Sequence, residues 1–246
     1  MRLDTADLSY SRPLDAIDAL RLTFDGASPE GVISGVLAEF GNEVALVSSF
    51  GAEAAVLLHM ASKVDRNIPI LLIDTLMLFE ETLEYQKTLS ATLGLTNVVH
   101  LRPDPADTAR IDPNGDLHRR DQDACCDFRK VLPLERALAR WPVVISGRKR
   151  FQASTRQALE VFEADGERLR VNPLAHWNAQ DLRAYMDAHD LPRHPLVAKG
   201  YPSIGCAPCT TRVAEGEDPR AGRWRGTDKV ECGIHFGADG RILRAS

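Results

Sequence analysis

Short apolar runs that alternate with helix-like stretches constrain the fold of this chain more than any other feature. Strand candidates rich in Val, Leu and Ile lie at Glu43–Ser48, Ile70–Ile73, Asn97–Leu101, Val143–Ser146 and Leu169–Val171. Such runs indicate strands that are buried on both faces, as in a parallel sheet covered by helices. Because crossovers between parallel strands are right-handed, we predict an α/β fold with a doubly wound, mostly parallel sheet.

Helix patterns fill the gaps between these strand candidates. We expect helices at Ala52–Lys63 and Phe79–Leu93, and one that starts at the N-cap Asn178 and reaches about His189. A further helix is expected from near Cys126 to Arg140, with Pro133 distorting or ending it. The alternation of strand and helix is typical of a doubly wound domain.

Polar residues follow the strand candidates at the carboxyl edge, where such sheets bind their ligands. The turn Ser48–Glu53 joins a strand to a helix, and its hydroxyls, its glycine and the helix N-terminus can bind an anionic group. It is not the P-loop of ATPases, because no Lys follows the glycine. The residues that we expect to contact a small ligand at this edge are Ser48, Ser49, Gly51, Asp74 and Arg148.

Charge and hydropathy narrow the class of ligand. The net charge is −5, yet basic residues cluster at Arg129–Lys130, Arg148–Arg150 and Arg220–Arg225. Focused basic groups on an acidic chain fit a small anion better than a nucleic acid. The longest apolar run, Ile70–Ile73, is far too short to cross a membrane. No signal peptide is evident, so we expect a cytoplasmic protein without membrane contact.

The five cysteines indicate a metal site and a reactive thiol. In a reducing compartment they are not expected to form a disulfide framework. Cys125 and Cys126 are adjacent, and Cys206 and Cys209 form a C-x-x-C motif. Four thiolates can hold either zinc or an iron–sulfur cluster, although adjacent cysteines suit the larger group better. The remaining Cys232 is a candidate nucleophile.

The apolar pattern ends at about Pro202, which suggests how the chain is divided. We expect a domain at residues 1–210 that binds the ligand and carries the metal site. Residues 211–246 have few apolar side chains up to Glu231, so we expect them to form a flexible C-terminal arm that carries Cys232.

These motifs together resemble the assimilatory sulfonucleotide reductases of the adenine-nucleotide alpha hydrolase superfamily, and among them the iron–sulfur type that reduces adenosine 5′-phosphosulfate (APS). The resemblance runs in order from about residue 40 to 235. It is carried by the segments Cys-Cys-Asp-Phe-Arg-Lys-Val (125–131), Ser-Gly-Arg-Lys-Arg (146–150), Ser-Thr-Arg (154–156), Val-Asn-Pro-Leu (171–174), His-Pro-Leu (194–196), Gly-Tyr-Pro-Ser-Ile-Gly-Cys-Ala-Pro-Cys-Thr (200–210) and Glu-Cys-Gly-Ile-His (231–235).

The resemblance implies a mechanism, cofactor and partners. Cys232 would attack the sulfur of APS, and thioredoxin or a glutaredoxin-like dithiol would then release sulfite from the S-sulfocysteine. A 4Fe–4S cluster would be held by Cys125, Cys126, Cys206 and Cys209. The family commonly forms homo-oligomers. Further residues would bind the substrate or support the thiolate: Lys130, Arg220, Arg223 and His235 around the sulfate, and Arg156 at the nucleotide end.

The chain departs from the family pattern in three places, and three other functions are weighed. Leu76 stands where glycine is usual, Glu80 stands where proline is common, and residues 236–246 extend past the usual end. A reductase of the 3′-phosphorylated nucleotide (PAPS), or of both nucleotides, is the nearest alternative. An ATP-dependent tRNA-modifying enzyme of the same superfamily and a zinc-stabilised binding module are the others.

Overall fold

A six-stranded sheet forms the centre of the molecule, for which a computed structural model describes residues 13–227, 229 and 231. The strand order is β3-β2-β1-β4-β6-β5, and every neighbouring pair is parallel except β5 with β6. This order reverses beside β1, so the crevice between β1 and β4 is the switch point of a doubly wound sheet. The strands are β1 (Val44–Ser48), β2 (Ile70–Ile73), β3 (Val98–Leu101), β4 (Val143–Ser146), β5 (Phe162–Asp165) and β6 (Arg168–Val171).

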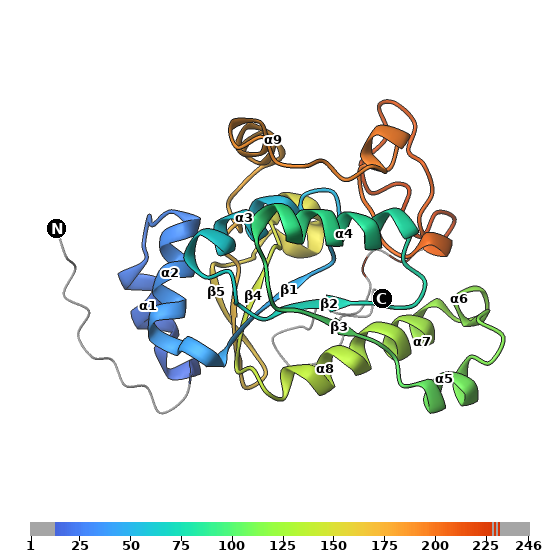
Figure 1. Ribbon diagram of the computed structural model, residues 1–246, viewed down its shortest axis with the longest axis horizontal. Coiled ribbons are helices and arrows are strands. Elements are labelled where there is room, and N and C mark those ends of the chain that lie inside the picture. Colours follow the sequence, from blue (N-terminus) through green and yellow to red (C-terminus); the bar gives the residue numbers. More distant parts are fainter. Residues whose placement is uncertain (1–12, 228, 230, 232–246) are drawn as a thin grey trace.

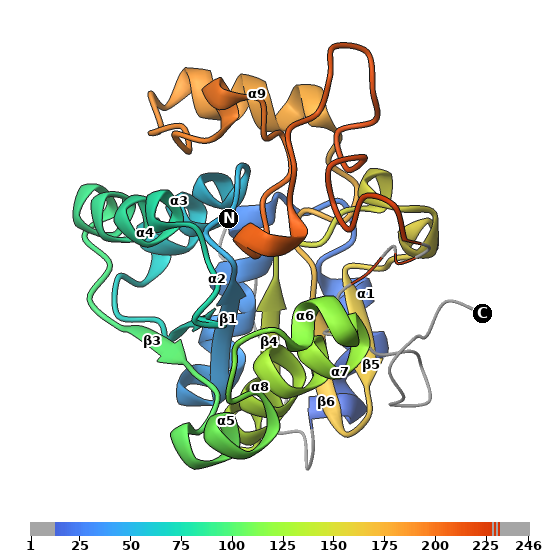
Figure 2. The same cartoon turned by 90° about the vertical axis from the view of Figure 1, so that its right-hand side faces the viewer.

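Helices cover both faces of this sheet (Figure 1). One layer contains α3 and α4, with α9 outside them, and the opposite layer contains α7 and α8 (Figures 1 and 2). The helices described are α1 (Ile17–Thr23), α2 (Pro29–Phe40), α3 (Ala54–Val64), α4 (Glu80–Leu93), α5 (Pro105–Ile111), α6 (Leu117–Arg120), α7 (Gln122–Cys126), α8 (Leu132–Leu138) and α9 (Ala179–Ala188). None of these described helices is long and apolar enough to span a membrane.

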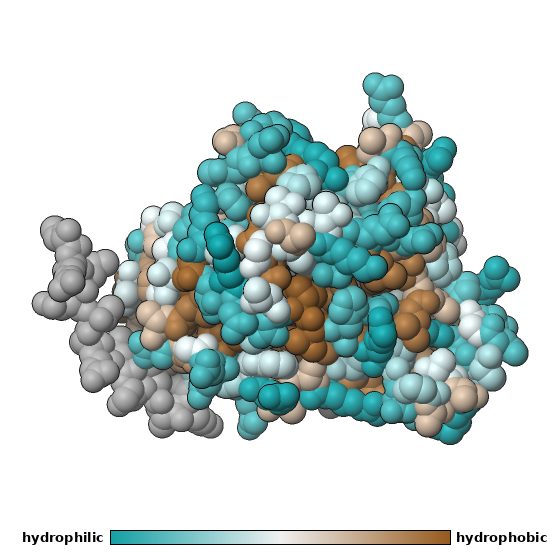
Figure 3. Space-filling view, in the orientation of Figure 1, coloured by the Kyte–Doolittle hydropathy of each residue, from teal (hydrophilic) through white to brown (hydrophobic). Residues whose placement is uncertain are grey.

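The alternation of side chains along each strand divides the core in two. Leu46 and Leu72 point into the large cluster with α2, α3 and α4, whereas Ala45 and Leu71 belong to the smaller cluster with α8. All four side chains are fully buried. Strands that are apolar on both faces therefore reflect burial on both faces, as the sequence predicted. Outside this core, hydrophilic side chains cover most of the face seen in Figure 3.

Local capping explains where several helices begin and end. Ser28 accepts a hydrogen bond from the Gly31 N–H at the start of α2, and Asn178 accepts from two N–H groups at the start of α9. Gly94 ends α4 in the left-handed conformation, with a φ of 67°, which glycine adopts without strain.

The predicted fold class is confirmed, but two elements differ from the prediction. The strand β5 was not predicted, because its sequence Phe-Glu-Ala-Asp carries two acids; it pairs antiparallel with β6. The helix predicted from near Cys126 begins at Gln122 instead, where Asp121 caps it by accepting from the Ala124 N–H.

This cysteine-bearing helix runs through Pro133 without ending. The residues Asp127–Val131 form a π-helical turn between α7 and α8. In a regular α-helix Pro133 would collide with the carbonyl four residues earlier and leave it unbonded. The wider π turn lies directly before the proline, and turns of this kind are frequent at functional sites.

Candidate active site

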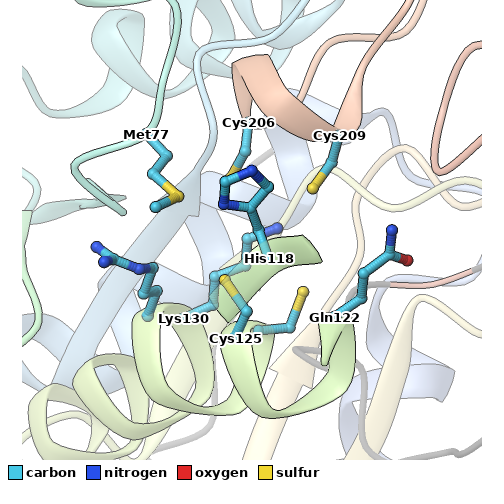
Figure 4. A pocket seen from close by; sticks show the side chains of 9 residues that line it. Met77, His118, Gln122, Cys125, Lys130, Cys206 and Cys209 are labelled. Atoms are coloured by element: carbon cyan, nitrogen blue, oxygen red, sulfur yellow. The ribbon is translucent and has the colours of Figure 1, made fainter. Parts of the chain in front are cut away.

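Four cysteines from two distant segments gather beside the carboxyl edge of the sheet. Cys125 and Cys126 lie at the end of α7, and Cys206 and Cys209 lie on a short 3₁₀ turn that faces it (Figure 4). They line one pocket together with Met77, His118, Gln122, Arg129 and Lys130. The four cysteines of the two predicted motifs thus border the same pocket.

The surroundings of these thiols disfavour free thiolates. Burial and the neighbouring sulfurs raise the pKa of Cys125 to about 12, and burial also raises the pKa of Cys209. Cys125, Cys126 and Cys206 are each at most 7% exposed. Thiols of this kind are inert as nucleophiles, but they are suited to soft metals, which displace the proton.

The turn that carries Cys206 is fixed to the loop after β2. Thr75 places its hydroxyl 3.2 Å from the Cys206 sulfur, and the Ala207 N–H donates to the Met77 carbonyl over 2.8 Å. Leu78 and Cys206 form an antiparallel bridge. The end of β2 therefore sets the position of the second cysteine pair.

A buried ion pair supports the other side of the pocket. Arg129 donates to Asp112 over 2.6 Å and to the Thr75 carbonyl over 3.0 Å, and both charged side chains are almost inaccessible. Burial alone would raise the pKa of Asp112, but hydrogen bonds from Arg129 and the Leu117 N–H hold it below its usual value. Lys130, the next residue, is 9% exposed and lines the cysteine pocket.

Arg223 lies on the far side of the Cys206–Cys209 turn. Its guanidinium donates to the Ile204 carbonyl over 3.2 Å and stacks 4.5 Å from the centre of the Trp224 ring. A Cβ atom at Gly205 would lie 2.3 Å from this guanidinium, so glycine leaves the space that Arg223 occupies. Trp224 itself is 3% exposed and packs against Cys126 and Cys209.

Lys229 joins the C-terminal segment to the cysteine-bearing helix. Its ammonium donates to Asp123 and, over 3.3 Å, to the Gln122 carbonyl. Burial alone would lower the pKa of Lys229, but its hydrogen bonds with Asp123 and Cys126 raise it. This lysine is therefore held as a cation next to a cysteine of the pocket.

The predicted nucleotide loop follows β1 at the switch point. Ser48 accepts from the Phe50 N–H over 3.2 Å, while Ser49 is exposed and Gly51 is partly exposed. Phe50 is fully buried although its φ of 47° lies in the left-handed region. Glu53 closes the loop by an ion pair with Lys149, 2.7 Å away, which connects it to the residues after β4.

The loop after β2 contains a second left-handed residue. Leu76, which stands where the family has glycine, has a φ of 60° and is 55% exposed. Its N–H donates to Asp74 over 3.1 Å. Asp74 also accepts from Arg102 over 2.9 Å, and these hydrogen bonds lower its pKa against the opposing effect of burial. Asp74 thus shapes the loop and pairs with Arg102.

Two predicted ligand residues pair with acids. Arg148 lies 3.5 Å from Glu163, and burial together with the charge of Arg170 lowers its pKa to about 10. Arg156 donates to both carboxylate oxygens of Glu231, over 2.9 and 3.0 Å.

Glu231 also meets the predicted catalytic residue Arg220. The two lie 3.5 Å apart, so Glu231 connects this arginine with Arg156. Glu231 directly precedes the predicted nucleophile in the sequence. The predicted Cys232 and His235 lie outside the described residues.

Sequence reasoning missed several residues of the site. Met77 and His118 border the cysteine pocket, and Trp224 and Glu231 connect the C-terminal segment to the body. These residues carry no local signal, since their partners are distant in the sequence.

Comparisons with known proteins identify the family. A family model described as phosphoadenosine phosphosulfate reductase domain matches residues 43–212. A protein of Mesorhizobium japonicum named adenosine 5′-phosphosulfate reductase is 58% identical over 80% of this chain and 78% of its own length. One of the same name from Chelativorans sp. is 48% identical over 92% of this chain and 94% of its own length.

A solved structure supports the same assignment. The phosphoadenylyl-sulfate reductase of Candida auris, solved as a phosphate complex, has 27% sequence identity and a TM-score of 0.68. The match covers 82% of this chain and all of that one. With the sheet order, the cysteine motifs and the match over residues 43–212 in agreement, the chain belongs to the phosphoadenosine phosphosulfate reductase family of oxidoreductases.

Proposed function

We propose that this enzyme reduces APS to sulfite and AMP, with thioredoxin or a glutaredoxin-like dithiol as the reductant, and so serves sulfate assimilation and cysteine biosynthesis. The observation that carries the proposal is the gathering of four cysteines, three of them buried and Cys209 partly exposed, around one pocket that Lys130 also lines. The similarity to proteins named APS reductase supports APS as the substrate.

The proposed reaction has two steps at Cys232. Its thiolate attacks the sulfur of APS, the bond from that sulfur to the phosphate oxygen breaks, and AMP leaves with the electron pair. A thiolate of the reductant then attacks the Cys232 sulfur of the S-sulfocysteine, and sulfite leaves with the electrons of the bond between the two sulfurs. The second thiol of the reductant then attacks this mixed disulfide, which closes the disulfide of the reductant and releases the Cys232 thiolate. The two electrons that sulfur gains therefore come from the dithiol.

The basic residues at the site suit a transferred group with spread negative charge. Such a group needs positive donors more than covalent machinery, as in phosphoryl transfer. Lys130 lines the pocket, and Arg220 and Arg223 offer planar forks that bind oxyanions bidentately. We assign these three side chains to the sulfate and His235 to the support of the Cys232 thiolate.

The nucleotide is proposed to bind at the switch point. Ser48, Ser49 and Gly51 form the turn after β1 and precede the N-terminus of α3, where backbone N–H groups favour an anion. Arg156, on a short 3₁₀ turn after β4, would meet the nucleotide phosphate from the other side of the crevice.

The four cysteines fit an iron–sulfur cluster of the 4Fe–4S type. They are soft donors, three of them buried, that line one pocket together. Side chains of neighbouring residues such as Cys125 and Cys126 diverge on a helix, which suits a cluster with several corners better than one small ion. When bound, such a cluster joins α7 to the Cys206–Cys209 turn and adds inorganic charge beside Lys130.

Anaerobic purification followed by a sulfite assay tests this proposal. We expect a brown protein with iron and acid-labile sulfide that releases sulfite from APS and reduced thioredoxin. The variant Cys232→Ser should keep its colour and bind AMP but produce no sulfite and retain no label from ³⁵S-APS.

Two outcomes would contradict the assignment. A colourless protein that contains zinc would remove the cluster. Faster sulfite release from PAPS than from APS would change the substrate and leave the chemistry at Cys232 intact.

A further inference from the structure

The carboxylate of Glu231 pairs with two arginines, Arg156 and Arg220, that the proposed function assigns to binding of the substrate. The carboxylate of Glu231 accepts two hydrogen bonds from Arg156, over 2.9 and 3.0 Å, and lies 3.5 Å from Arg220. Their exposed fractions are 9% for the Glu231 side chain, 7% for Arg156 and 24% for Arg220. A bidentate, nearly buried pair of this kind is among the stronger interactions between charged side chains.

This ion pair belongs to a network that reaches the predicted nucleotide loop. The remaining terminal nitrogen of Arg156 donates to Gln152 over 2.6 Å, and Gln152 donates to Glu53 over 2.9 Å. Glu53 in turn pairs with Lys149. The contact between Arg156 and Glu231 therefore lies on the nucleotide side of the site, connected to the loop that follows β1.

The C-terminal segment has a separate attachment just before Glu231. Lys229, two residues earlier, donates to Asp123 and to the Gln122 carbonyl on α7. Release of Glu231 would leave this contact in place.

We propose that Glu231 is an internal anion that holds the C-terminal segment against Arg156 and Arg220 in the ligand-free enzyme, and that the nucleotide phosphate displaces it. This inference rests on the proposed function, because it takes Arg156 as a ligand of the nucleotide. Substrate binding and release of the residue before the nucleophile become one event. Glu231 is thus a positioning residue for Cys232.

The exchange is electrostatically reasonable. The phosphosulfate group of APS and the phosphate of AMP each carry about two negative charges, against one for a carboxylate, and both offer the same geometry to a guanidinium fork. The displaced carboxylate moves into water, where its charge is solvated, so neither partner is left buried and unpaired. A ligand shifts such an equilibrium by its differential affinity for the two states, and here only the released state lets Arg156 bind the phosphate in place of the Glu231 carboxylate.

Binding of AMP to the holoenzyme tests the proposal without turnover. The variant Glu231→Gln keeps the size of the side chain but removes the charge, which weakens hydrogen bonds from an arginine roughly twofold. We expect the Kd of AMP, measured by calorimetry, to fall by roughly three- to tenfold, corresponding to about 0.6–1.4 kcal/mol. Loss of a merely structural contact would weaken binding or leave it unchanged.

Hydrogen exchange provides the second measurement. In the ligand-free protein, a peptide that spans residues 220–231 should exchange faster in Glu231→Gln than in the wild type, and AMP should accelerate exchange in the wild type. The matched control is Glu217→Gln, which removes an exposed glutamate that pairs with Arg225 over 2.9 Å on the same segment. It should change neither quantity.

The outcomes separate this inference from the proposed function. An unchanged or higher Kd of AMP in Glu231→Gln overturns the displacement, even if exchange becomes faster. If the wild type binds no AMP at all, the proposed function fails first. Retained AMP binding with PAPS as the better substrate would change the substrate of the proposal and leave the displacement standing.

Discussion

The segment after Thr210 is attached to the body of the protein in two places of opposite character. The first, the cysteine attachment, consists of Trp224 packed against Cys126 and Cys209, with Lys229 bound to α7. The second, the glutamate attachment, consists of Glu231 with Arg156 and Arg220. One depends mainly on apolar burial and the other entirely on charge.

This difference determines what each attachment can do. Burial of a large ring is not directional and has no counterpart that a small anion could supply. An ion pair at the mouth of a site can instead be exchanged for a ligand of the same sign. We infer that the cysteine attachment is permanent and that the glutamate attachment is the switchable one.

Removal of one cysteine should have the largest effect of the changes proposed. It tests the cysteine attachment, which we infer to be permanent. We expect Cys206→Ser to lose the brown colour and all sulfite production, because the proposed cluster would lose a ligand and Thr75 would lose its sulfur partner. Absorption spectra and the sulfite assay are the measurements. An unchanged spectrum would show that Cys206 is not a ligand.

The buried ion pair beneath the pocket tests whether the cysteine side is a rigid frame. Breaking a buried pair by removal of one partner costs about 3–5 kcal/mol, so we expect this loss of unfolding free energy for Arg129→Met. Urea unfolding measures it. The control Arg110→Met removes an arginine that is 70% exposed and pairs with Asp107, and should cost less than about 1 kcal/mol. Equal losses of unfolding free energy in the two variants would show that the ion pair of Arg129 does not make the cysteine side rigid.

A direct contrast of the two attachments comes next in size. Trp224→Ala should lower the unfolding free energy by about 3 kcal/mol, because it removes a buried ring. Glu231→Gln should lower it by less than about 1 kcal/mol, since the end of the segment can open locally without global unfolding. If Glu231→Gln proved the more damaging, the assignment of permanent and switchable attachments would be reversed.

Salt should produce the smallest effect and the most selective one. Between about 0.1 and 1 M NaCl the screening length falls from about 10 to 3 Å, which weakens accessible charge pairs and leaves apolar contacts almost unaffected. The pair of Glu231 with Arg220, which is 24% exposed, and the pair of Lys229 with Asp123, which is 73% exposed, are the accessible ones, whereas the nearly buried pair with Arg156 is screened less. Hydrogen exchange should therefore increase by no more than roughly twofold in peptides containing Glu231 and remain constant around Trp224. A uniform response along the segment would mean that both attachments open together.

Much of the fold was predictable because its signals are local. The strands β1, β2 and β4 are continuous apolar runs, and the residues that follow them lie at one edge of the sheet as expected. In contrast, β5 was missed because a strand with two acids resembles a loop. Its pairing depends on β6, to which a tight turn at Gly166 connects it.

The site was predictable only in part, for a related reason. Thiols have few roles, so the spacing of Cys125, Cys126, Cys206 and Cys209 along the chain is informative by itself. An arginine or glutamate has many roles, and Arg156 meets Glu231 from 75 residues away. No local pattern encodes such a contact, which tertiary folding alone creates.

Two of the non-glycine residues in the left-handed conformation, Phe50 after β1 and Leu76 after β2, have a consequence for ligand binding. Each conformation costs roughly 1 kcal/mol, and persists because the surrounding structure enforces it: burial of the Phe50 ring, and hydrogen bonds from the Leu76 and Met77 N–H groups. The loops that follow β1 and β2, on one side of the switch point, thus acquire their shape during folding. A nucleotide that enters between preorganised loops has little backbone entropy left to remove, which favours tight and selective binding.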